Sequence, residues 1–366
     1  MSKAAELAAL IANVNRGSSL GNKNFLINSA MNVAQRGTSI STVSGFTLDR
    51  WRVDKSNTDN WAATITQSST VPTGYGFNNS WKIDTTTAES ALASDEYAVV
   101  EQVIEAQNLQ SLSYGTSSAK AITLSFWVRS NVTGTYAISI YQYDDNRMIN
   151  ATYTISSANT WEKKEITFVG DTTGVIDDDT GSGLKINWIL AAGSDYQGTA
   201  QSTWATYANA MFGNGQTANI MSSTDNEFLM TGCMLEIGEK ATEFEHEPIG
   251  ITLEKCQRYY TKYQAGSTYS YLGSGQASSA TTARIVFQFP TEMNHTPALE
   301  QSANNTLNVY ATDSEAFSTD ATINHPSTHS SAITCTVSSG LTQRAGASVV
   351  ANGTTDAYLA FESEIT

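Results

Sequence analysis

Short runs in which apolar and polar residues alternate make up most of the chain, and they predict β-strands. Residues 122–130 alternate from face to face, as a half-exposed antiparallel strand does. Further alternating or apolar runs occupy residues 136–143, 148–155, 161–168, 185–191 and 227–237. The first two of these flank the polar turn 144–147, which predicts a hairpin. The pattern is typical of an antiparallel jelly-roll β-sandwich, which we expect over residues 22–248.

A change of pattern after residue 237 predicts a junction between two β domains. Pro248 and Gly250 interrupt regular structure. Thr252 is then expected to cap a helix that continues to Gln264. The apolar face of that helix would hold Leu253, Cys256, Tyr260 and Tyr263. We therefore assign residues 249–264 to a short linker helix.

The remaining residues, 265–366, are rich in Ser, Thr and Ala, and they contain short apolar runs with turn signals between them. Strands are expected at residues 271–272, 283–290, 307–310, 333–337 and 357–361. Their spacing predicts a second, smaller C-terminal β-sandwich. The fold class expected for the chain is therefore all-β.

The N-terminal residues 2–15 have a helical pattern instead. Alanines favour the helix, and one apolar stripe combines Leu7, Leu10, Ile11 and Val14. Residues 15–24 form a Gly/Ser/Asn linker, so residues 1–21 are expected to be a helical arm and linker. The helix either packs on its own domain or docks on a neighbouring subunit, and the linker favours docking.

Composition narrows the class of protein. The 366 residues carry a net charge of −15, and charged residues are only 15% of the chain. An acidic chain of this kind is unsuited to nucleic acid, which requires clustered Lys and Arg. No apolar run approaches the roughly 18 residues of a membrane span, and Glu6 interrupts the N-terminal apolar stretch, so neither membrane insertion nor a signal peptide is expected. Cys233, Cys256 and Cys335 are expected to be small buried hydrophobes.

Three stretches resemble a known family. These are MLEIGEKATEFEHEPIG with LEKCQRYY at residues 234–260, NFLINSAMNVAQRGTS with GFTLDRWRV near the N-terminus, and RIVFQFPTEMNHTPAL from residue 284. They resemble bacteriophage tail-fibre and virion structural proteins that contain a jelly-roll domain similar to carbohydrate-binding modules. The resemblance implies a virion component made in the host cytoplasm, a homotrimer, and attachment through the N-terminal arm to other virion proteins of the tail or an adaptor.

Catalytic motifs are absent from the sequence. The four histidines show no metal-binding spacing, and there is neither a G-x-S-x-G elbow nor a phosphate-binding glycine loop. Glycoside hydrolysis needs two carboxylates across the scissile bond, and nothing in the sequence selects such a pair. We therefore expect no enzyme, and no cofactor.

Asp177 and Asp179, with Asp171 and Gly181 nearby, form an acidic loop. Ca²⁺ takes several oxygen ligands, and jelly rolls of the resembled family often carry a structural calcium. The loop lacks the ordered alternation of an EF-hand. A solvated acidic turn is the favoured interpretation, and a calcium site at Asp177 and Asp179 is the alternative.

Binding of a host-surface glycan would use exposed aromatic rings with amides beside them. Trp51, Trp127 and Trp161 lie in strand patterns and are expected in the core. The candidates for glycan binding lie in loops or beside a hairpin turn, and they are Trp61, Tyr75, Trp81, Tyr141, Tyr143, Tyr196, Trp204 and Tyr207. Burial against a partner subunit is the alternative role for these side chains.

Three hypotheses follow. The first is a non-enzymatic phage fibre protein that contributes to host attachment. The second is a glycan-binding adhesin acting through the loop aromatics, and the third is a polysaccharide-degrading enzyme. Glycan binding that is lost in aromatic variants would favour the second, and release of reducing ends would favour the third.

Overall fold

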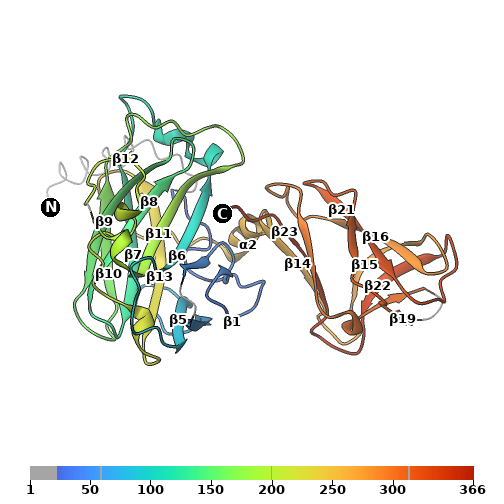
Figure 1. Ribbon diagram of the computed structural model, residues 1–366. Helices are drawn as coiled ribbons and strands as arrows, with labels where there is room; N and C mark the ends of the chain where they lie inside the picture. Colours follow the sequence, from blue (N-terminus) through green and yellow to red (C-terminus); the bar gives the residue numbers. More distant parts are fainter. Residues whose placement is uncertain (1–22, 58–59, 199, 312–313) are drawn as a thin grey trace. The chain divides into compact units, whose positions relative to one another are not determined.

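The computed structural model of the chain describes residues 23–57, 60–198, 200–311 and 314–366 (Figure 1). The arm at residues 1–21, with Leu7, Leu10, Ile11 and Val14, lies outside the described residues. Within them the chain is almost entirely antiparallel β-structure with a few short helices, which confirms the all-β fold class. The described chain divides into two compact units.

The first unit holds residues 52–247 together with 23–32 and 39–45, and it is a sandwich of two sheets. The six-stranded sheet has the order β1 (Ser39–Ser41), β4 (Ala62–Ser68), β5 (Ser80–Thr87), β13 (Glu227–Ile237), β7 (Ile122–Ser130) and β10 (Glu162–Phe168). The seven-stranded sheet has the order β12 (Ala205–Thr206), β9 (Arg147–Ile155), β8 (Gly134–Gln142), β11 (Ser182–Ala192), β6 (Tyr97–Glu105), β3 (Arg52–Ser56) and β2 (Gly45–Phe46).

Aromatic rings from both sheets fill the space between them. Phe126 on β7 lies 5.9 Å from Trp188 on β11, ring centroid to centroid, and 5.1 Å from Tyr153 on β9. Phe126 and Trp188 are both fully buried. Truncation of such a side chain to Ala typically costs about 3–5 kcal/mol. The side chains on the inward face of each strand therefore stabilise the sandwich. Those on the outward face remain available for other contacts.

Short 3₁₀ helices lie in the connections between strands. In the first unit they are η1 (Ala106–Leu112), η2 (Ser194–Tyr196), η3 (Asn209–Met211) and η4 (Ile220–Ser222), and the second unit contains η5 (Asn304–Thr306). The segment from η2 to η3 packs its apolar side chains, Met211 and Phe212, on the outward face of the seven-stranded sheet. One end of that face is therefore covered by the chain itself.

The second unit, mainly residues 248–366, is a smaller sandwich. Its three-stranded sheet has the order β14 (Tyr260–Gln264), β23 (Tyr358–Glu362) and β17 (Ala298–Gln301). Its seven-stranded sheet has the order β19 (Ser314–Ala316), β18 (Leu307–Tyr310), β22 (Gly346–Ala351), β15 (Tyr271–Ala277), β16 (Thr282–Gln288), β21 (Ser330–Thr336) and β20 (Thr322–Asn324). Buried residues such as Ile285, Phe287 and Phe361 form its core.

The linker helix is shorter than the sequence pattern predicts. Helix α2 spans Ile249–Gln257, so the expected helix over residues 249–264 is wrong in its second half. Residues Tyr260–Gln264 form strand β14, which pairs with β23. Tyr and Thr favour strands, and pairing with β23 satisfies their backbone groups, so tertiary contacts override the helical spacing. The helix also begins at Pro248 as its N-cap rather than at Thr252, which is buried within it.

Two segments early in the chain belong to the second unit, although their position in the sequence favours the jelly roll. These are residues 33–38 and 46–51. Gln35 Nε2 donates a hydrogen bond to the carbonyl oxygen of Tyr260 at 2.7 Å, and Arg36 pairs with Glu364 at 3.3 Å. Gln35 and Arg36 therefore bind groups of β14 and of the C-terminal end of the chain, which lie far away in sequence.

Candidate functional site

Three of the eight candidate aromatics are buried, which corrects the expectation that loop composition exposes them. Trp61 is 2%, Trp81 0% and Trp204 7% exposed. The indole Nε1 of Trp61 donates to Thr85 Oγ1 at 3.2 Å, and that of Trp204 donates to the carbonyl oxygen of Val169 at 2.8 Å. An indole whose N–H is satisfied inside the protein can be buried at little cost. These three rings therefore present no face to a ligand.

Tyr75 is exposed as expected, but it lies apart from the other candidates. Its side chain is 51% exposed, and its ring centroid lies 4.3 Å from that of Trp127 on β7. Trp127 is only partly buried, on the outward face of the six-stranded sheet, so its expected place in the core is wrong. Alternation along β7 predicts two faces, and it is Phe126 that faces inward. Trp51 is fully buried as expected, and Trp161 is partly buried.

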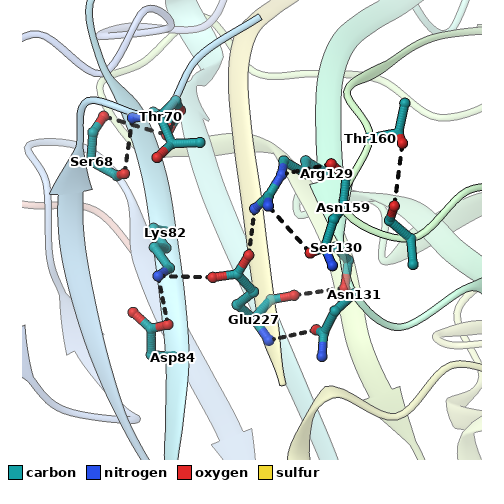
Figure 2. A network of polar contacts seen from close by, with 12 residues as sticks. Ser68, Thr70, Lys82, Asp84, Arg129, Ser130, Asn131, Asn159, Thr160 and Glu227 are labelled. Atoms are coloured by element: carbon teal, nitrogen blue, oxygen red, sulfur yellow. Dashed lines mark hydrogen bonds and ion pairs between the residues drawn. The ribbon is translucent and has the colours of Figure 1, made fainter. Parts of the chain in front are cut away.

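The outward face of the six-stranded sheet also carries a network of charged side chains (Figure 2). Glu227 on β13 lies between Lys82 on β5, at 2.8 Å, and Arg129 on β7. Lys82 also pairs with Asp84 at 2.8 Å. Arg129 in turn donates to Asn159 at 3.2 Å. The charged groups of this face satisfy one another, so the network explains stability better than ligand binding.

The other four candidates gather on the outward face of the seven-stranded sheet of the first unit. Tyr141 lies 4.9 Å from Tyr143 and 5.5 Å from Tyr207, ring centroid to centroid. Tyr196 lies 5.0 Å from Tyr97, a ring that the sequence did not single out. All five rings are partly buried. We call this surface the tyrosine face, made of Tyr97, Tyr141, Tyr143, Tyr196 and Tyr207.

A row of polar residues crosses the same sheet beside these rings. Strand register aligns one residue from each of β9, β8, β11, β6 and β3, namely Asn150, Ser139, Asn187, Glu101 and Arg52. Asn187 Nδ2 lies 3.3 Å from Ser139 Oγ, and Arg52 pairs with Glu101 at 2.5 Å. At the β9 end, Asn150 binds the backbone of residues 201 and 211, which closes the row there.

Two buried polar atoms of this surface have no hydrogen-bond partner among the described residues. They are Tyr143 Oη and Asn187 Oδ1. A buried polar group without a partner costs about 1–3 kcal/mol, and most such groups in native proteins are satisfied. These two atoms are enclosed by neighbouring atoms, so what this face offers to a ligand is its partly exposed rings.

Charged residues surround the ring of Tyr143. Lys185 on β11 pairs with Glu101 at 3.4 Å, and its Nζ lies 5.7 Å from the Tyr143 ring centroid. Arg52 also pairs with Asp54 at 3.1 Å. Burial raises the pKa of Tyr143, and the charge of Glu101 raises it further, so the Tyr143 hydroxyl stays protonated. The surface thus has two cationic and two anionic side chains in balance.

Sequence reasoning missed Arg52, Glu101, Lys185 and Asn187. Alternation in residues 185–191 places Lys185 and Asn187 on the face opposite Ile186 and Trp188, and this signal was available. The alignment of Asn187 with Glu101 and Ser139 depends on strand register, which no local pattern shows.

The acidic loop does not gather ligands for a metal ion. Asp177 and Asp179 are exposed, and Asp179 Oδ1 accepts a hydrogen bond from Gly181 N at 2.8 Å. Among the described residues, no group of three or more His, Cys, Asp or Glu side chains is arranged to hold a metal ion. Two exposed carboxylates alone supply fewer than the several oxygen ligands that Ca²⁺ takes, and the solvated turn stays a prediction.

The described part of the chain contains no helix long and apolar enough to cross a membrane. All three cysteines are buried and free. Burial raises the pKa of the Cys233 thiol, which suits a small core side chain and not a nucleophile.

Comparison with known proteins yields solved structures only. No protein-family model matches the chain, and no curated protein does. The enzymatically active domain of tailspike protein 4 from bacteriophage CBA120 is 13% identical over 59% of this chain, which spans 22% of that chain, with a TM-score of 0.32. A family 11 carbohydrate-binding module from Clostridium thermocellum, in complex with a β-1,3-1,4-mixed-linked tetrasaccharide, is 13% identical over 57% of this chain and 98% of the module, with a TM-score of 0.28. The module TmCBM61, in complex with β-1,4-galactotriose, is 13% identical over 59% of this chain and 100% of the module, with a TM-score of 0.29. At these identities no family membership follows.

Proposed function

We propose that the chain is a non-enzymatic surface-fibre component of a bacteriophage particle that contributes to host attachment by binding a glycan on the tyrosine face. The observation that carries glycan binding is the cluster of partly exposed rings on one sheet face. Sugar recognition uses aromatic rings against the apolar ring face, and amides or hydroxyls at its edges. Tyr141, Tyr143 and Tyr207 supply such rings side by side.

The charge balance of this face favours an uncharged glycan. Arg52 and Lys185 are both paired with Glu101, and Arg52 also with Asp54. An anionic sugar would have to displace one of these carboxylates from its cation. An uncharged sugar can stack on the partly exposed rings without breaking a pair.

A binding role fits these carboxylates better than a hydrolytic one. A glycosidase places two carboxyl groups on either side of the scissile bond. Here Glu101 and Asp54 both contact the guanidinium of Arg52, which joins them into one ion-paired group. The sequence resemblance to phage virion proteins supports the particle role, and with it the expected trimer and the location in the virion.

The direct test of glycan binding is an array of uncharged and acidic oligosaccharides probed with the full chain. We expect binding to an uncharged oligosaccharide, and Tyr143→Ala should weaken it by about 2–10-fold because it removes one stacking ring. Tyr141→Ala should also weaken it. Tyr75→Ala is the matched control, since Tyr75 is an exposed tyrosine in the loop between β4 and β5, where its ring packs against Trp127 of the six-stranded sheet.

Two results would contradict this assignment. One is a wild-type chain that binds no oligosaccharide on the array. The other is binding that Tyr143→Ala and Tyr141→Ala leave unchanged. Antibody labelling of purified particles tests the virion role separately, and absence of the chain from particles would exclude it whatever the array shows.

A further inference from the structure

Three exposed tyrosines lie on the second unit, where the sequence pattern singled out no binding residue. Tyr269, Tyr271 and Tyr310 are 71%, 63% and 43% exposed. Tyr271 and Tyr310 stand on β15 and β18, the two neighbours of β22, and their ring centroids are 6.1 Å apart with an interplanar angle of 81°. Large rings exposed together on regular strands are unusual unless a ligand uses them.

A β-bulge in β15 places Tyr271 on the outward face. Tyr271 pairs with Val350 and Gly273 with Val349, so Leu272 is an extra residue on this strand. Leu272 packs against the core, as does the inward side of Gly273. Regular alternation from the exposed Ser274 would instead point Leu272 outward and Tyr271 inward. The bulge therefore turns Tyr271 outward and Leu272 inward. Bulges commonly re-aim a side chain near a functional site.

Gly273 is required for this arrangement. A Cβ built at Gly273 would lie 2.6 Å from the ring of Phe287, closer than real Cβ atoms come to other atoms. Two successive residues, Leu272 and Gly273, thus face the core, and only glycine fits the second position. The sequence Tyr-Leu-Gly at residues 271–273 therefore lets the strand keep the Tyr271 ring in solvent while Leu272 and Gly273 face the core.

Among the described residues, the surface around the rings is largely uncharged and rich in hydroxyl groups. One register row runs from β18 to β20 across the sheet, and it consists of Tyr310, Ser348, Ser274, Val286, Ala332 and Asn324. The adjacent positions Asn308 and Val350 are uncharged as well, and the row on the other side contains one charged residue, Arg284. In a chain with a net charge of −15, such a surface is unsuited to a partner recognised by charge.

We infer that Tyr271 and Tyr310 form a second glycan-binding surface on the second unit, and that its ligand is an uncharged oligosaccharide. Stacking on two rings set at a steep angle holds one sugar ring by its apolar face and contacts a neighbouring sugar. Ser274 and Ser348 present hydroxyls to the sugar edges. A protein partner is disfavoured, because a stable interface needs about 800 Å² per partner with an apolar centre, and serines surround these tyrosines.

This inference does not depend on the tyrosine face of the first unit, and four full-length chains separate the two. They are the wild type, Tyr141→Ala/Tyr143→Ala, Tyr271→Ala/Tyr310→Ala, and the combination of both pairs. Each is applied to the same array of uncharged and hexuronate-containing oligosaccharides. Because Tyr271 and Tyr310 are exposed, we expect their replacement to leave the melting temperature unchanged.

The expected result is that Tyr271→Ala/Tyr310→Ala weakens binding to an uncharged oligosaccharide by about tenfold, both in the wild-type background and in the Tyr141→Ala/Tyr143→Ala background. Tyr271→Phe should retain most of the binding, because the ring is kept. Ile251→Ala, at an exposed apolar residue of helix α2 in the same unit, is the matched control and should bind as the wild type does.

The inference is overturned if the Tyr271→Ala/Tyr310→Ala chain binds every oligosaccharide as its parent does, whether or not the first-unit variant has lost binding. Binding of hexuronate-containing oligosaccharides alone also overturns it. A third result would reassign the surface to a protein receptor. In that case no oligosaccharide binds, and the double substitution abolishes attachment only to host-surface material that protease removes.

Discussion

Arg50 and Glu364 form an ion pair that is almost completely buried in the second unit, with side chains 1% and 2% exposed. The guanidinium carbon of Arg50 also lies 3.5 Å from the centroid of the Tyr259 ring. A buried cation is tolerated only when its charge is compensated, so removal of one partner is strongly destabilising. The pair joins residues 314 positions apart in sequence, both within the same unit.

We therefore predict that Glu364→Gln lowers the free energy of unfolding of the second unit by about 3–5 kcal/mol. Urea unfolding followed by hydrogen exchange of amides in residues 260–264 and 358–362 measures this unit in the full chain. Glu254→Gln is the matched control, because Glu254 is exposed on helix α2 and should change stability by less than about 0.5 kcal/mol. Equal effects of the two substitutions would contradict the prediction.

The same pair shows what the sequence could and could not predict. Alternation in residues 122–130 correctly predicts a strand, because side chains in a strand point alternately to its two faces. No local pattern indicates that Arg50 meets Glu364, or that residues 33–38 belong to the second unit, because these contacts depend on the packing of distant segments. Long-range register is likewise what brings Asn187 beside Glu101.

The candidate site illustrates the same limit in physical terms. Trp81 and Tyr141 both read as surface aromatics, yet Trp81 is fully buried and Tyr141 is partly exposed. Alternation says that a strand has two faces, but it does not say which face packs on the second sheet. It also does not reveal the bulge at Leu272, because one extra residue is visible only in the pairing with β22.

A carboxyl pair in the second unit predicts a dependence of stability on pH. The pKa of Glu362 is raised to about 7, chiefly by burial and also by a hydrogen bond with Glu300, while Arg36 at 3.6 Å opposes the shift. A glutamate in an unfolded chain titrates at about 4.3. Between these two values the folded state binds more protons than the unfolded state, so this group makes the protein less stable as the pH rises.

We accordingly expect Glu362→Gln to be destabilising at most slightly at pH 5, and to be stabilising relative to the wild type at pH 8. Gln keeps the neutral, hydrogen-bonding form of the side chain at every pH. The difference between the two unfolding free energies, measured from pH 5 to pH 8, isolates this group from other titrations. A difference that is constant over this range would show that Glu362 does not titrate in it.

The acidic loop leads to a prediction about calcium. Asp177 and Asp179 are exposed, and no third side chain among the described His, Cys, Asp and Glu residues joins them in a metal-binding group. We expect millimolar Ca²⁺ to leave the melting temperature unchanged, in the wild type and in Asp177→Ala/Asp179→Ala alike. A rise of the wild-type melting temperature with Ca²⁺ that the double variant lacks would instead support a calcium site in this loop.

We predict that removal of the N-terminal arm changes the oligomeric state. Leu7, Leu10, Ile11 and Val14 form an apolar stripe in the sequence, and a helix of about two heptads is unstable alone, so we propose that it is stabilised by association in a trimer. Deletion of residues 1–15 should then convert the trimer to monomers in sedimentation analysis, and Leu7→Ser/Leu10→Ser should do the same. Asn13→Ser, a change at a polar position of the same helix, should leave the trimer intact. A truncated chain that still assembles, and is still incorporated into particles, would show that the arm is dispensable for both.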